Sequence, residues 1–131
     1  MNKKIIFLLK LIAAFIMLQT LFYKFGGAQE SINLFTKLAG ENEVFLRIGT
    51  GVLELIAALL LFVPKKIWIG ALLTVGLMSG AILSHLTKIG IEHNGDGGLL
   101  FASAVFTLII GLIVLIFETK QNKTKTQLSD F

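Results

Sequence analysis

Four long apolar runs constrain this chain more than any other feature of its 131 residues. Each run has close to the ~20 residues that a helix needs to cross the hydrocarbon core of a bilayer. Charged residues make up 15% of the chain, whereas a soluble domain usually carries about 25%. Because too little polar surface remains to cover a water-soluble globule, the sequence predicts an all-α, integral membrane four-helix bundle. The expected spans are residues 5–23, 44–63, 67–86 and 99–117.

The first run has two interpretations. It follows Lys3 and Lys4, a charge pattern that secretory signal peptides share with membrane helices, and Gly26-Gly27-Ala28 offers a weak cleavage site. The run is long for the apolar region of a signal peptide. A retained transmembrane helix is therefore the preferred interpretation.

Positive charge is distributed unevenly between the two ends of the expected spans. Eight lysines flank the ends that carry the termini and the turn between the second and third spans, against four basic residues at the opposite ends. The positive-inside rule then places both termini and the Pro64-Lys65-Lys66 turn on the cytoplasmic side of the cell (inner or plasma) membrane. Since the basic residues do not gather with aromatic residues on one face, the expected partner is the lipid bilayer and not nucleic acid.

The connection between the first two spans, residues 24–43, contains apolar residues at helical spacing. They predict a short interfacial helix at the outer side, with Gly40 as its C-terminal stop. The residues on this face are Ile32, Phe35, Leu38 and Ala39.

The remaining segments are polar. Residues 88–98 form a glycine-rich connection in which Glu92, His93 and Asp96 are interpreted first as a hydrated loop. The expected division is a transmembrane domain over residues 1–118 and a polar, mobile cytoplasmic tail over residues 119–131.

Ionisable residues inside a span are costly and by default indicate a functional site. Glu54 lies ten residues into the second run, which puts it on the order of 15 Å deep, near the bilayer midplane. Arg47, Thr50 and Glu54 are spaced by three and four, so they share a helix face that should turn towards the bundle. Together with polar residues at the outer ends of other spans, they predict an outward-opening pocket above a dry inner half. Its expected lining is Gln19, Tyr23, Lys24, Arg47, Thr50, Glu54 and His85.

A structural interpretation of these groups stays open. Glu54 would then pair with Arg47, Lys24 or His85 and hold the helices in register. Arg47 and Lys24 could also snorkel to the outer interface, and His85 could lie near lipid head groups. With two histidines and no cysteine, neither the spacing nor the number of ligands favours a metal or haem site.

The second run contains Arg47-Ile-Gly-Thr-Gly-Val-Leu-Glu54-Leu, between a first run ending in Tyr-Lys-Phe and a third ending in Ser-His. Over residues 5–117 this pattern resembles the DoxX-like family of small four-helix membrane proteins. The resemblance implies a loosely defined redox role, as in subunits of a thiosulfate:quinone oxidoreductase, or a role in membrane-protein assembly. Because several related enzymes use cysteines and this chain has none, it implies no thiol redox cycle of the chain's own.

These observations leave two main functions. The first is a membrane subunit of a redox-related system that binds a quinone or another small molecule in the outward-facing pocket, as part of a membrane oxidoreductase. Whether the chain is itself an enzyme stays open. The second is a non-enzymatic assembly or scaffold protein that packs against a partner membrane protein or a second copy. Gly76, Gly80 and Ser84 form a ridge of small residues that suits close packing, inside the bundle or against a partner. A proton-coupled transporter is disfavoured, because the inner half lacks a polar lining.

Overall fold

The computed structural model describes residues 3–91 and 97–129, with side chains as far as residue 121, and nearly all of this chain is helical. The elements are α1 (Lys3–Phe25), α2 (Gln29–Ala39), the 3-10 turn η1 (Gly40–Asn42), α3 (Glu43–Leu60), α4 (Ile67–Ser84), the π-helical turn η2 (His85–Ile89) and α5 (Leu99–Ser129). The all-α prediction is confirmed. The charged loop residues Glu92, His93 and Asp96 lie outside the described residues.

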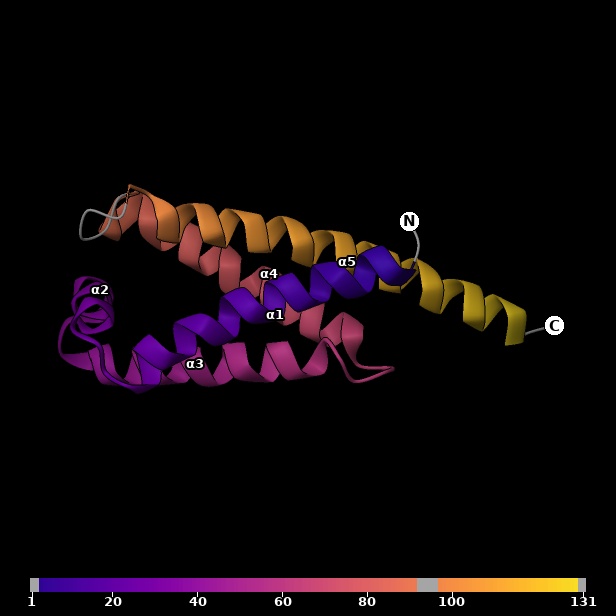
Figure 1. The fold of residues 1–131 in the computed structure, drawn as a ribbon, viewed down its shortest axis with the longest axis horizontal. Helices are drawn as coiled ribbons and strands as arrows, with labels where there is room; N and C mark the ends of the chain where they lie inside the picture. The colour runs from indigo at the N-terminus through magenta and orange to yellow at the C-terminus, as the bar shows by residue number, and fades with distance from the viewer. Residues whose placement is uncertain (1–2, 92–96, 130–131) are drawn as a thin grey trace.

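The four long helices alternate in direction (Figure 1). The start of α1, the α3–α4 turn and the end of α5 lie at one end of the bundle, while α2 lies across the other. α1 packs against α3 and α5, and α4 packs against the same two helices, which closes a four-helix ring. The end that holds the start of α1 and the end of α5 is named the terminal end below, and the opposite end is named the α2 end.

Small residues let the helices approach closely. Alanines from all four long helices contribute to the core, which is filled by side chains such as Met17, Leu61 and Val114. A Cβ atom on Gly70 would lie 2.7 Å from the backbone nitrogen of Leu61, so α3 and α4 can meet there only if residue 70 is glycine. The tight crossing fixes the register of these two helices.

The outer surface of the bundle is apolar. At most 33% of the apolar stretch of each candidate span is buried inside the molecule, and large side chains such as Phe15, Phe22 and Phe45 are 69%, 82% and 83% exposed. Among the described residues, the helices Lys3–Phe25, Ile67–Ile89 and Leu99–Gln121 are long and apolar enough to cross a membrane. Apolar side chains facing outwards in this number require lipid as solvent. The chain is therefore a multi-pass membrane protein that forms a helical bundle.

The remaining long helix, α3, differs from these three. It has 18 residues and carries Glu43, Arg47 and Glu54. Its apolar residues alone do not establish a membrane crossing, because three charges must first be accommodated inside the bundle.

Helix ends follow local sequence signals in most places. α2 ends at Ala39, and Gly40 adopts a φ of +58° while its N–H bonds to Thr36 O, as the sequence predicts. The buried face of α2 includes Leu34 and Phe35, which pack against Ile89 in a small apolar cluster at the α2 end. The segment expected to be a polar tail begins within α5, which continues as a helix to Ser129.

Candidate functional site

A buried carboxylate joins α3 to α1. Glu54 is only 3% exposed, and its Oε1 forms an ion pair with Lys24 Nζ near the end of α1. Its Oε2 lies 3.0 Å from the hydroxyl of Thr20, which also lies 2.8 Å from Met17 O. Thr20 and Lys24 are four residues apart, so α1 presents both to the same carboxylate. Each oxygen of Glu54 thus has a polar partner.

Arg47 supports this arrangement from an earlier turn of α3. The residue is 7% exposed, its Nε donates to Glu43 Oε2 at 3.0 Å, and its Nη1 donates to the backbone carbonyl of Lys24. Carbonyls in the last turn of a helix have no partner within the helix, so Arg47 satisfies one of them and adds positive charge where the helix dipole favours it. Arg47 therefore fixes the backbone from which the Lys24 side chain reaches Glu54.

An apolar groove of about 620 Å³ lies on the same two helices. It follows one face of α1 and touches α3 at Leu55, the residue after Glu54. Close contact between the helices continues at Gly51, where a Cβ atom would lie 2.7 Å from the ring of Phe25. The groove is lined by Leu18, Leu21, Phe22, Phe25, Gly26 and Leu55.

The structure brings together three of the seven residues expected at the site: Lys24, Arg47 and Glu54. Thr50 is partly buried on the same face of α3 but makes no side-chain hydrogen bond among the described residues. Gln19 and Tyr23 are on an exposed face of α1, with Tyr23 48% exposed.

His85 has different partners. It is 3% exposed, its Nδ1 lies 2.9 Å from Gly90 O, and its ring meets the ring of Phe101 edge to face at 5.7 Å. These contacts close the end of the π-helical turn onto α5. Among the three cations that the sequence left open as partners of Glu54, the partner is Lys24.

Sequence reasoning missed Thr20 and Glu43. Both stand four residues before a residue that was singled out, Lys24 and Arg47 respectively, and on a helix this spacing places two side chains side by side. That spacing is a signal that could have found them. Within the described part of the chain, no three His, Asp or Glu side chains gather in a group that could hold a metal ion.

The terminal end contains a cleft that the sequence did not predict. A cleft of about 800 Å³ opens there between α1, the α3–α4 turn, α4 and α5. Lys10 lines it and is buried, with 8% exposure. The expectation of a dry inner half is therefore wrong, because a buried ammonium group and a cleft are found in it.

No family model matches this chain, and no curated protein or solved structure is significantly similar to it. The resemblance to the DoxX-like family consequently stays a hypothesis. What is established is a small all-helical protein with three membrane-length apolar helices.

Proposed function

We propose that all four long helices cross the bilayer, with both termini and the α3–α4 turn in the cytoplasm and α2 at the outer interface. The charges of α3 support a crossing because each has a partner inside the chain: Glu54 pairs with Lys24, and Arg47 with Glu43. Paired charges that face the bundle are the usual form of ionisable residues within spans. The excess of lysines at the terminal end supports the orientation.

We further propose that the chain is a membrane subunit of a redox-related system and binds a quinone-class molecule at the Lys24–Glu54 pair. The observation that carries this proposal is the buried ion pair between α1 and α3, at the level of the apolar groove on the same helices. The groove suits an apolar ring and tail. Lys24 and Glu54 do not line the groove, but each is next in sequence to a lining residue, Phe25 and Leu55; this pair would supply the few polar contacts that orient a ligand in such a site.

Lys24 and Glu54 have the complementary chemistry for a quinone head group. The ammonium of Lys24 carries three N–H donors, and among the described residues its hydrogen-bond acceptor is Glu54. Lys24 retains 14% exposure of its side chain, and in this proposal one of its remaining N–H groups would donate to a quinone carbonyl. The carboxylate of Glu54 can accept a hydrogen bond or a proton from the hydroxyl of the reduced quinol. The electrons would pass between the quinone and a partner redox subunit.

The test is quinone binding by the full chain in phosphatidylcholine nanodiscs. A short-chain ubiquinone or menaquinone analogue is titrated calorimetrically into wild type, Lys24→Met/Glu54→Gln and Gln19→Met. The double variant removes both charges together, so neither stays buried without its partner. We expect the double variant to bind at least about tenfold more weakly, the loss of one good charge-assisted hydrogen bond. Gln19→Met, a change on the exposed face of α1, should bind as wild type does. Equal binding by all three proteins, or binding by none, would reject the proposal.

A second function, assembly or scaffolding, is favoured by a different observation. The glycines of the α4 ridge, Gly76 and Gly80, are exposed, and a Cβ atom on either would have no neighbour within 4 Å. The ridge therefore faces outwards instead of packing inside the bundle, and such ridges permit close approach of another membrane helix. Mild-detergent purification tests this function. A partner protein or second copy that co-purifies with wild type should be lost from Gly76→Leu/Gly80→Leu. It should be retained by the control Ala102→Leu, a change at an exposed position of α5. Purification of a lone wild-type chain would count against it.

A further inference from the structure

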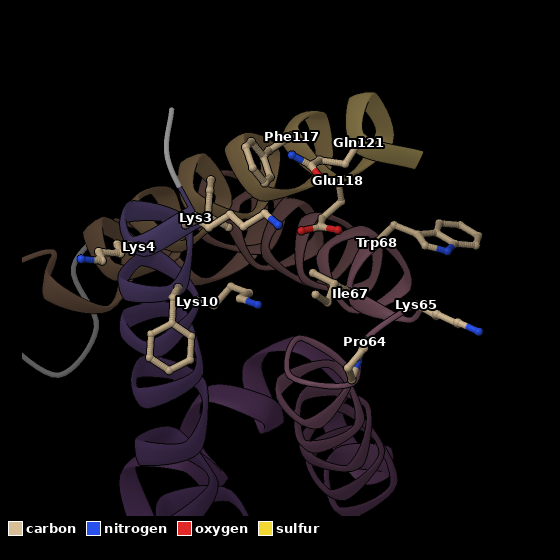
Figure 2. A pocket seen from close by; sticks show the side chains of 12 residues that line it. Lys3, Lys4, Lys10, Pro64, Lys65, Ile67, Trp68, Phe117, Glu118 and Gln121 are labelled. Carbon is tan, nitrogen blue, oxygen red and sulfur yellow. The ribbon is translucent and has the colours of Figure 1, made fainter. Parts of the chain in front are cut away.

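The cleft at the terminal end gathers positive charge next to apolar surface. Its lining includes Lys3, Lys4, Lys10 and Lys65, together with the carboxylate of Glu118 and the rings of Phe7 and Trp68. Figure 2 shows Lys3 and Lys10 directed from α1 into the cleft, and Glu118 facing them from α5. Lys4 and Lys65 point outwards from its rim. Four lysines against one carboxylate make this an anion-attracting space.

Among the lysines of the cleft, Lys10 is buried, and no anion of the described residues pairs with it. Its side chain is more than nine-tenths buried, and its Nζ lies 5.5 Å from the ring centroid of Phe62 and 5.9 Å from that of Phe7. Among the described residues it forms no ion pair and no hydrogen bond. Aromatic faces attract a cation but replace only part of its hydration. An ammonium buried in this way, and open to a cleft, is suited to meet an anion.

The turn at the edge of the cleft is held in an unusual conformation. Lys65 has a φ of +68° and is the only non-glycine residue with positive φ among those described. A residue with a Cβ atom is disfavoured in this region, where glycine, or asparagine with its local hydrogen bonding, is accommodated more easily. The conformation places a lysine at the rim where glycine or asparagine would be less strained.

We propose that this cleft binds the head group of an anionic phospholipid, with its phosphate at Lys10 and Lys3. The acyl chains would follow the exposed apolar side chains beside it, where Phe7 is 51% and Trp68 is 40% exposed. Basic pockets between membrane helices on the cytoplasmic side are a recurrent form of anionic lipid site, and tryptophan is enriched at the level of the head groups. This apolar flank favours a lipid over a soluble phosphate.

The cleft lies at the terminal end of the bundle, where α1 begins, whereas Lys24 lies in the last turn of α1, towards the α2 end (Figure 1). It shares no residue with the proposed quinone site. Failure of one proposal therefore leaves the other standing.

Trp68 supplies the measurement, since it is the only tryptophan of the chain and lines the cleft. The full chain is reconstituted in phosphatidylcholine vesicles that contain brominated phosphatidylglycerol or, separately, brominated phosphatidylcholine. Bromine quenches nearby tryptophan, so the difference in quenching gives the preference for the anionic lipid. Variants are Lys10→Met, Lys10→Arg and Glu118→Gln, with Lys88→Met as an exposed lysine control at the α2 end.

We expect wild type to prefer the anionic lipid and Lys10→Met to lose about fivefold of that preference, the effect of one lysine near a membrane surface. Lys10→Arg and Lys88→Met should keep it, and Glu118→Gln should increase it because a competing carboxylate is removed. Removing an unpaired buried charge should not unfold the protein, so Lys10→Met remains testable. Equal quenching by both lipids in wild type, or a Lys10→Met preference equal to that of Lys88→Met, would overturn the proposal. Displacement of the brominated lipid by inorganic phosphate, beyond that caused by chloride at equal ionic strength, would also overturn it and assign the cleft to a soluble anion.

Discussion

The burial of the ion pair between α1 and α3 predicts how much stability is lost when either Lys24 or Glu54 is replaced. Lys24→Met leaves Glu54, which is 3% exposed, with Thr20 as its remaining partner. Glu54→Gln leaves the ammonium of Lys24, whose side chain is 14% exposed and can snorkel outwards. Removing one member of a buried pair costs about 3–5 kcal/mol of unfolding free energy. We place Lys24→Met at the upper end of this range and Glu54→Gln at the lower.

The double variant distinguishes the energy of the interaction between Lys24 and Glu54 from the separate effects of replacing each residue. Because it leaves no uncompensated charge, Lys24→Met/Glu54→Gln should unfold within about 1–2 kcal/mol of wild type and be more stable than either single variant. The assay is unfolding by SDS in mixed micelles, followed by circular dichroism and by the fluorescence of Trp68. Gln19→Met, an exposed residue on α1, should change stability by less than about 0.5 kcal/mol. If the costs of the two single changes simply add in the double variant, Lys24 and Glu54 are not an ion pair, and the reasoning is refuted.

Three further predictions concern the packing of α3 against α4, the hydrogen bond from Arg47 to the carbonyl of Lys24, and the topology. Gly70→Ala should destabilise the bundle by about 1–3 kcal/mol in the same SDS assay, because the added methyl group overpacks the α3–α4 crossing. Gly76→Ala, where the methyl group enters open space, should stabilise it by up to about 1 kcal/mol. Equal effects of the two changes would show that the two helices do not meet at residue 70. Arg47→Met should weaken binding of the quinone analogue although Lys24 and Glu54 are both present, because it removes the hydrogen bond to the carbonyl of Lys24. Unchanged binding would show that Arg47 does not position Lys24 for the ligand. Single cysteines can be introduced into this cysteine-free chain and labelled with a membrane-impermeant maleimide. Lys66→Cys should react from the cytoplasmic side, and Gln29→Cys should react only from the outer side. Labelling of both variants from one side would exclude the proposed topology.

The helices themselves could be read from the sequence because each apolar run has the length of a span and is bounded by a turn signal. Pro64 follows α3, and Gly40, in a left-handed conformation, ends α2. The shared face of Arg47 and Glu54 was likewise a matter of helical spacing. These features depend on residues near one another in the chain, so local rules suffice for them.

The partners of the charged groups could not be read in the same way. Which cation meets Glu54 depends on the register between α1 and α3, which is fixed by the close approach of Phe25 to Gly51. That approach brings Lys24 to the carboxylate, while Arg47 turns to Glu43 and to a backbone carbonyl. Sequence spacing offers candidates, but only interhelical packing selects among them.

The cleft at the terminal end was missed for a related reason. Lys10 interrupts the first apolar run, and in the sequence it contributes only to the count of cytoplasmic charges. It is buried where the rings of Phe7 and Phe62 meet its ammonium, beside a cleft whose other walls are the α3–α4 turn, α4 and α5. Of the α5 residues that line the cleft, Gln121 falls in the segment expected to be a polar tail, and Phe117 and Glu118 were expected to end the transmembrane domain, so no wall for a cleft was foreseen there.

The central claim, that the α1–α3 seam at Lys24 and Glu54 is a quinone site, is tested most directly by photoaffinity labelling. An azido-quinone analogue is photolysed with the full chain in nanodiscs, and the labelled peptides are identified by mass spectrometry. We expect labels within residues 18–26 of α1 and at or next to Leu55 of α3. Excess unlabelled quinone should remove these labels, and they should be absent in Lys24→Met/Glu54→Gln. Labels confined to other helices, or labels that excess quinone and the double variant leave unchanged, would contradict this claim.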